Sequence, residues 1–169
     1  MFRKAILKGL SGVFVNGKEG ASYINSLKPS RTHILFQSST HSCLVEKKLK
    51  PISNEVRWIY VGRLVENKGL KNFLIEVASV DGYLRKKLHI DFVGVGELED
   101  WLRIYAQANE INIKLHGNSN GSKIIELLDK SDFFIFPTLG DEWGLAVVEA
   151  MNRGLPILGS NRSGAIIEL

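Results

Sequence analysis

The stretch DFFIFPTLGDEWGLAVVEAMNRGLP, residues 132–156, has the clearest structural pattern in this chain. An apolar run over residues 133–136 stops at Pro137, and a polar loop follows. Residues 143–153 are mostly apolar and are followed by a glycine and a proline, which commonly end a helix. The pattern predicts a strand, a loop and a helix. Because this helix is apolar almost all round, we expect it to be buried.

Three acidic side chains stand out in this apolar stretch. Asp141 and Glu142 precede the first helical turn, where free N–H groups and the positive end of the helix dipole attract anions. Glu149 lies inside the helix. Such a helix offers amides to a phosphate and a carboxylate to hydroxyl groups. The spacing leaves another interpretation open, in which Asp141 is only a helix cap and Glu149 pairs with Arg153 at i,i+4.

A second segment, YVGRLVENKGL at residues 60–70, predicts a strand that ends at Gly62 and a loop that leads into a helix. Arg63 and Lys68 flank this loop. Two cations beside the end of a parallel strand suit a diphosphate, with Arg as a planar fork and Lys as a point charge. The alternative is a solvated loop in which Glu66 forms a salt bridge with Lys68.

Two further strand-to-helix turns contain glycine. Gly94 lies in DFVGVGELEDWL, residues 91–102, which lacks the third glycine of a dinucleotide-binding fingerprint. The run GNSNG, residues 117–121, matches the GxSxG turn that presents the nucleophile of α/β hydrolases, so Ser119 is a candidate nucleophile. All four histidines precede Ser119, whereas that fold places its histidine after the serine. The hydrolase interpretation is therefore disfavoured.

Strand and helix patterns alternate along the chain. Short continuous apolar runs, such as VRWIYV and DFFIF, are typical of parallel strands covered on both faces. Their alternation with helices predicts a doubly wound, Rossmann-like α/β fold, whose ligands bind beyond the carboxyl ends of the strands. The expected elements are strands at 56–61, 88–93, 112–116, 132–136 and 156–159, and helices at 69–80, 97–108, 121–129 and 143–153.

The first 53 residues follow the same pattern on a smaller scale. They predict a short helix, and then a strand at 12–16, a helix at 18–27, a strand at 33–37 and a basic linker. We therefore divide the chain into a fragment, residues 1–53, and one larger domain, residues 54–169.

The composition is ordinary for a globular protein, with 44% hydrophobic and 24% charged residues. No apolar run approaches the roughly 18 residues of a membrane span, and no signal peptide is visible. A single cysteine, Cys43, excludes an internal disulfide and fits a reducing compartment. We therefore expect a cytoplasmic protein with at most peripheral contact at the inner membrane surface.

Charge is unevenly distributed along the chain. Residues 1–57 hold 10 Lys and Arg against 3 Asp and Glu, which would suit an anionic lipid surface. Only Lys47, Lys48 and Lys50 cluster, so scattered solvated lysines are the favoured interpretation. No nucleic-acid-binding motif accompanies them, and no set of His, Cys, Asp and Glu has metal-ligand spacing.

The stretch from Asp141 onward resembles the signature of the retaining nucleotide-sugar glycosyltransferases of family 4, also called group 1, which have the GT-B fold. That signature is an acidic residue, seven residues and a glutamate, with an aromatic–Gly pair between them and EAM at its end. Here it matches Asp141, the pair Trp143-Gly144 and Glu149-Ala150-Met151, followed by GLP. The first acid is usually Glu, so Asp141 is a shorter substitute and Glu142 is a rival one position out of register.

Two more motifs of the family, GRL…KG and VGxG, match residues 62–69 and 93–96. The resemblance implies that Arg63 and Lys68 neutralise the donor diphosphate and the departing nucleoside diphosphate. It implies that Glu149 holds the ribose hydroxyls and that Asp141, a catalytic residue together with Arg63 and Lys68, lies near the donor sugar. The other donor-binding residues that it implies are Gly62, Gly94, Gly117, Asn118, Glu142, Trp143, Gly144 and Leu145.

The resemblance also implies the reaction. A sugar would pass from a UDP-, GDP- or ADP-sugar to a hydroxyl of a glycan or lipid-linked acceptor, as in polysaccharide biosynthesis. Configuration would be retained through front-face attack, without a metal or another cofactor. Family acceptor sites belong to an N-terminal domain, of which residues 1–53 match only the end. The alternative is a non-catalytic nucleotide-sugar-binding remnant, or a chain whose other half is a separate partner chain.

Overall fold

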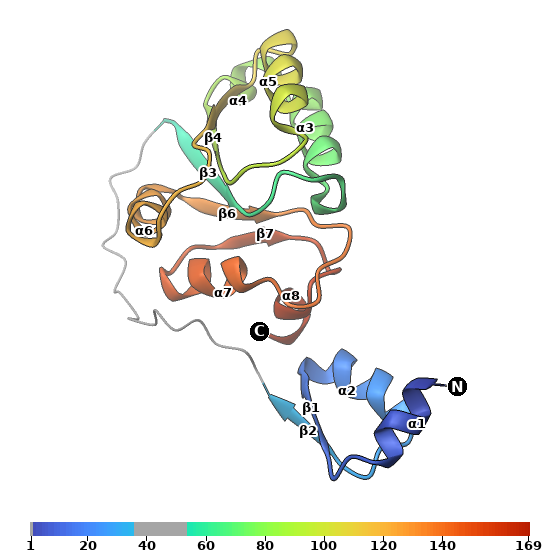
Figure 1. The fold of residues 1–169 in the computed structure, drawn as a ribbon. Coiled ribbons are helices and arrows are strands. Elements are labelled where there is room, and N and C mark those ends of the chain that lie inside the picture. The colour runs from blue at the N-terminus through green and yellow to red at the C-terminus, as the bar shows by residue number, and fades with distance from the viewer. Residues whose placement is uncertain (1, 36–53) are drawn as a thin grey trace.

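The computed structural model describes residues 2–35 and 54–169 (Figure 1). The predicted linker, with Cys43 and the lysine cluster at 47–50, lies outside these residues. The amino-terminal unit contains α1 (Phe2–Lys8), β1 (Val13–Asn16), α2 (Gly17–Ser26) and β2 (Thr32–Leu35). β1 and β2 pair in parallel.

A five-stranded, all-parallel sheet forms the second unit, with the strand order β5-β4-β3-β6-β7. Its strands are β3 (Val56–Val61), β4 (Leu88–Val93), β5 (Asn112–Leu115), β6 (Phe133–Phe136) and β7 (Ile157–Gly159). The chain starts in the centre at β3, runs outward to β5, and returns to the other side of β3 at β6. The predicted doubly wound, Rossmann-like fold is confirmed. Its switch point lies between β3 and β6.

Helices cover the sheet on both sides, as buried parallel strands require. The segment between β3 and β5 contributes η1 (Glu66–Lys68), α3 (Leu70–Ser79), α4 (Gly82–Arg85) and α5 (Glu99–Ala108). The segment after β5 contributes α6 (Gly121–Lys130), α7 (Leu145–Asn152) and α8 (Gly164–Glu168). Figure 1 shows α3 and α5 together on one side of the sheet, with α7 and α8 on the other.

Buried aromatic rings form the centre of the core. Tyr60 on β3 lies 6.1 Å from Phe92 on β4 and 6.4 Å from Phe136 on β6, measured between ring centroids. All three side chains are at most 3% exposed.

Among the described residues, no helix combines the length and the apolar character that crossing a membrane requires.

The structure differs from the sequence-based expectation at several elements. The sequence patterns do not predict η1, α4 or α8, because a single turn depends on a local cap more than on periodicity. In α4, for example, the Asp81 carboxylate accepts hydrogen bonds from the Tyr83 and Leu84 amides. The helix expected at 143–153 begins two residues later, because Gly144 has a left-handed φ of 95°.

The expectation that this helix is buried all round is wrong. Leu145 and Met151 are 43% and 37% exposed, whereas Val147 and Ala150 are completely buried. Leu145 is exposed because it lies in the wall of a surface cavity, which is described below.

A matched pair of substitutions on α3 tests the core. Leu74 is completely buried, and its neighbour Ile75 is 43% exposed. Leu74→Ala leaves a cavity, so we expect it to lower the free energy of unfolding by about 2–5 kcal/mol. Ile75→Ala is expected to cost much less. Urea denaturation of both variants measures the difference, and equal losses would contradict the assigned orientation of α3.

Candidate functional site

Glycines allow the carboxyl ends of three neighbouring strands to lie in contact. The Gly94 amide donates a hydrogen bond to the Gly117 carbonyl at 2.9 Å, which connects the ends of β4 and β5. A Cβ atom at Gly94 would lie 2.0 Å from the Gly62 carbonyl oxygen, and Gly94 has a φ of 138°. No other residue fits there without moving the end of β3. Gly62, Gly94 and Gly117 therefore form one continuous edge.

The loops after β3 and β6 also lie in contact. Gly69 has a φ of 68°, and a Cβ atom there would lie 2.0 Å from the Pro137 carbonyl oxygen. This close approach brings Lys68 of the first loop to Asp141 of the second, and their side chains form an ion pair. The two side chains are only 13% and 19% exposed, so water screens this pair less than a surface pair.

The turn before α7 depends on Asp141 and Gly144. The Asp141 carboxylate accepts a hydrogen bond from the Trp143 amide at 3.3 Å. At Gly144, a Cβ atom would lie 3.0 Å from both the Phe136 ring and the Ser163 hydroxyl. α7 has no cap from the residue before it, because Gly144 has no side chain. The free N–H groups of its first turn are therefore left for another acceptor.

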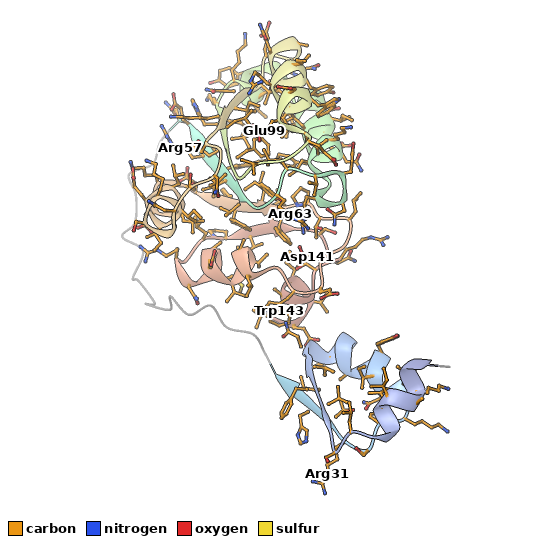
Figure 2. The ribbon with its side chains drawn as sticks, viewed as in Figure 1. Arg31, Arg57, Arg63, Glu99, Asp141 and Trp143 are labelled. Carbon is orange, nitrogen blue, oxygen red and sulfur yellow. The ribbon has the colours of Figure 1, made fainter. Side chains whose placement is uncertain are left out.

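These loops enclose a cavity of about 350 Å³, which we call the Lys68 cavity. Leu145 and Ala146 of the first turn of α7 also line it. Figure 2 shows Arg63, Asp141 and Trp143 in this part of the molecule. An arginine, a lysine and an uncapped helix start can together hold an anion with several negative charges. The predicted site residues in its wall are Gly62, Arg63, Lys68, Asp141, Glu142, Trp143, Gly144 and Leu145.

Tyr60 is a residue of this site that the sequence-based argument missed. It is completely buried, and its hydroxyl donates a hydrogen bond to the Arg63 carbonyl at 2.9 Å. Burial, and secondarily the negative charge of Asp141, raise the pKa of Tyr60 well above its usual value. The sequence did contain a signal for it. Tyr60 places a hydroxyl near the end of a mostly apolar strand, and a buried hydroxyl needs a hydrogen-bond partner.

Two smaller cavities lie in the same unit. One of about 250 Å³, the Asn118 cavity, shares Gly62 and Arg63 with the Lys68 cavity and is also lined by Gly94 and Asn118. The other, of about 280 Å³, lies between α6 and α7 and contains Glu149. Ile124 lines both smaller cavities. Glu149 is therefore not in the wall of the Lys68 cavity.

The two ion pairs expected in the alternative interpretations, Glu66 with Lys68 and Glu149 with Arg153, do not form. Lys68 pairs with Asp141, and Glu66 pairs with Lys71 instead.

At the other end of the motif, Arg153 does not pair with Glu149. It donates hydrogen bonds of 2.7 and 2.5 Å to Asp129 of α6. The helix-cap interpretation of Asp141 is wrong, because Gly144 is the residue before α7. The Asp141 carboxylate instead accepts a hydrogen bond from the Trp143 amide in the preceding turn and binds Lys68.

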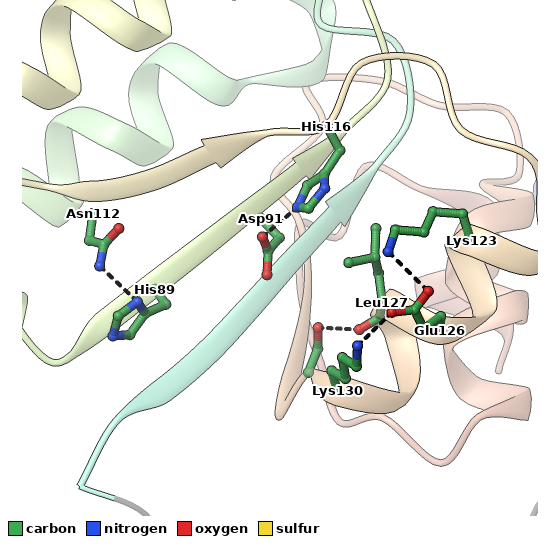
Figure 3. A network of polar contacts seen from close by, with 9 residues as sticks. His89, Asp91, Asn112, His116, Lys123, Glu126, Leu127 and Lys130 are labelled. Carbon is green, nitrogen blue, oxygen red and sulfur yellow. Dashed lines mark hydrogen bonds and ion pairs between the residues drawn. The ribbon is translucent and has the colours of Figure 1, made fainter.

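Polar contacts on β4, β5 and α6 are separate from this arrangement (Figure 3). His116 Nε2 lies 2.6 Å from an Asp91 carboxylate oxygen, and both side chains are mostly buried. Hydrogen bonds from Lys130 and Lys123 lower the pKa of the exposed Glu126 to about 2.

Ser119 makes no hydrogen bond to a histidine within the part of the chain that the structure describes, so nothing here supports a hydrolase triad. The described residues also contain no group of three His, Cys, Asp or Glu side chains arranged to hold a metal ion.

An all-parallel, doubly wound sheet with cavities along its carboxyl edge defines a Rossmann-like α/β protein. The family described as "Glycosyl transferases group 1" matches residues 45–169, and the chain belongs to this family.

Known proteins resemble the chain over part of their length. The amylovoran biosynthesis glycosyltransferase AmsK of Erwinia amylovora is 32% identical over 117 residues, which cover 64% of this chain and 28% of that protein. Sucrose-phosphate synthase from Thermosynechococcus elongatus superposes with a TM-score of 0.75 at 18% identity, over 96% of this chain and 43% of that one.

The structure of Anabaena Alr3699/HepE in complex with UDP and glucose superposes with a TM-score of 0.68 at 18% identity, over 93% of this chain and 46% of that one. This chain shares the GT-B glycosyltransferase fold with these two structures. The chain spans only about a quarter of the length of AmsK.

The raised pKa of Tyr60 predicts how stability depends on pH. Folded Tyr60 keeps its proton, while the unfolded chain releases it above about pH 10. This contribution to stability is present below about pH 10 and is lost as the pH rises above it. Tyr60→Phe has no proton to release, so it should not show the loss of stability that Tyr60 causes above about pH 10. At neutral pH the substitution is expected to lower the free energy of unfolding by about 1 kcal/mol, because the hydrogen bond is missing.

Urea denaturation at about pH 8 and about pH 10.5, on either side of the pKa of free tyrosine, measures both effects. Tyr83→Phe is the control, since Tyr83 is 69% exposed. If Tyr60→Phe and wild type lost the same stability between the two pH values, the assigned protonation of Tyr60 would be wrong.

Proposed function

We propose that this chain is the donor-binding part of a retaining glycosyltransferase of the family 4 type. Residues 54–169 are its nucleotide-sugar-binding domain, and residues 1–53 belong to the end of an N-terminal domain. The observation that carries the proposal is the convergence of Arg63, Lys68 and the uncapped start of α7 on one cavity of about 350 Å³. A diphosphate matches these donors in charge and in hydrogen bonding.

In the proposed reaction, the bond between the anomeric carbon and the diphosphate oxygen breaks while the acceptor oxygen bonds to that carbon on the same face. The acceptor proton passes to the leaving diphosphate, whose negative charge grows. Arg63, Lys68 and the α7 amides stabilise that charge, which lowers the barrier without requiring a metal. The protein thus contributes mainly charge and position.

We assign the first acidic position of the motif to Asp141. Its carboxylate binds Lys68 and accepts from the Trp143 amide, whereas the neighbouring Glu142 is exposed. The ion pair keeps the Lys68 ammonium at the cavity wall, although the long lysine side chain would otherwise be free to move into water. Asp141 then lies near the donor sugar.

The nucleoside extends from the diphosphate along the cavities that continue past Arg63. The Gly94 and Asn118 backbone lies along this route, and Glu149 offers a carboxylate to the ribose hydroxyls. UDP is the first nucleotide to test, because the HepE structure with the same fold holds UDP and glucose. GDP and ADP complete the panel.

The proposal separates donor binding from transfer. Because the chain spans 28% of the length of AmsK, the acceptor-binding part belongs to the rest of a complete transferase, in the same or a partner chain. Nucleotide binding is therefore the decisive first measurement.

Isothermal titration with UDP, GDP, ADP and the matching nucleosides tests the diphosphate site. Arg63→Ala and Lys68→Ala each remove a charge-assisted contact, so each is expected to weaken diphosphate binding about tenfold. Nucleoside binding should change by less than about twofold, since these side chains are assigned to the phosphates alone.

Lys71→Ala is the matched control, because Lys71 lies on α3 and pairs with Glu66 away from the cavity. Equal losses for diphosphate and nucleoside in Arg63→Ala and Lys68→Ala would count against the assigned role.

A further inference from the structure

The start of α2 meets α8 at a contact between the two units of the chain. The Lys18 backbone amide donates a 2.5 Å hydrogen bond to Glu168 Oε1, and Lys18 Nζ lies 3.6 Å from Glu168 Oε2. Asn16, the residue before α2, does not cap the helix with its side chain. Glu168, 150 residues further along the chain, thus accepts the hydrogen bond that a local capping side chain usually accepts.

Glu168 is unusually buried for a carboxylate. Its side chain is only 2% exposed. A buried charge is costly unless it is paired and hydrogen-bonded. The first turn of α2 supplies an N–H donor and the positive end of the helix dipole, and the Lys18 ammonium adds a positive charge. Separating α2 from α8 would remove the hydrogen bond to Oε1 and the ion pair to Oε2, which has no hydrogen-bond partner among the described residues.

Gly17 allows this close approach. It has a φ of 72°, which favours glycine, and a Cβ atom there would lie 3.2 Å from Glu168 Oε1 and 3.3 Å from the Trp143 ring. The start of α2 thus packs against both Glu168 and Trp143. Trp143 is 4% exposed.

Trp143 connects this contact to the Lys68 cavity. Its carbonyl accepts hydrogen bonds from the Ser163 hydroxyl at 2.6 Å and from the Ala165 amide at 2.9 Å, at the start of α8. A Cβ atom at Gly164 would lie 2.4 Å from the Glu142 carbonyl oxygen. Glu142 and Trp143 line both the Lys68 cavity and a cavity of about 650 Å³ between the two units.

We propose that Glu168 is a positioning residue that locks the amino-terminal unit onto the donor site. By capping α2, it holds that helix against α8 and Trp143. It thereby keeps the cavity wall of Glu142, Trp143 and Gly144 in the geometry that binds the donor. The effect on donor affinity rests on the proposed function, whereas the lock itself does not.

Amide hydrogen exchange of the whole chain tests the lock. Glu168→Ala removes the acceptor, so the Lys18 amide should exchange about fivefold faster, the usual size of a lost cap. Glu168→Gln keeps an acceptor oxygen but loses the charge, and it should lie between the alanine variant and wild type. Glu76→Ala is the control, since it removes the same charge from an exposed position on α3.

The amides of α3 show whether only the general stability has changed. If Glu168→Ala accelerated the Lys18 and α3 amides equally, or left the Lys18 amide unchanged, the lock would be overturned.

Titration with UDP on the same variants tests positioning. Glu168→Ala is expected to weaken UDP binding about threefold or more, which corresponds to part of a typical cap energy, and Glu76→Ala should leave it unchanged. Faster Lys18 exchange with unchanged UDP affinity would overturn the positioning role. If wild type binds none of UDP, GDP and ADP, the proposed function fails, and the exchange result alone decides whether Glu168 locks the two units together.

Discussion

The ion pair between Lys68 and Asp141 joins two loops that are 73 residues apart in the sequence. These loops follow β3 and β6, the two strands between which the sheet order reverses. At such a switch point neighbouring loops diverge to opposite faces and leave a crevice. Here the pair spans the crevice, and Gly69 lets the backbones approach closely enough for it to form. The shape of the Lys68 cavity depends on this contact, because both loops line the cavity.

Helix starts in this protein are completed in three different ways. Asn120 caps α6 with its own side chain, through a 2.9 Å hydrogen bond from the Lys123 amide. The first turn of α2 receives its carboxylate from Glu168, in the other unit. α7, whose first turn lies at the Lys68 cavity, follows Gly144, which has no side chain to cap it. The same physical requirement therefore gives a local turn, a contact between units and, in the function that we propose, a place for an anionic ligand.

Hydrogen bonds to backbone carbonyls also shape the Lys68 cavity. The Tyr60 hydroxyl donates a hydrogen bond to the Arg63 carbonyl. The Ser163 hydroxyl, immediately before α8, donates one to the Trp143 carbonyl. Both contacts act on the backbone, so the charged side chains start from fixed positions. Because a rigid arrangement of donors need not reorganise when charge develops, it stabilises that charge more than mobile groups do.

The order of strands and helices, and the grouping of the motif residues at one edge of the sheet, followed from the sequence alone. Apolar periodicity is local, and a parallel sheet brings the ends of its strands together. The partner of each charged side chain was decided only by the tertiary structure. Lys68 selects Asp141 over the nearby Glu66, and Arg153 selects Asp129 over Glu149 on its own helix. Spacing along the chain shows which partners are within reach, but burial and loop contacts determine which of them a charge meets.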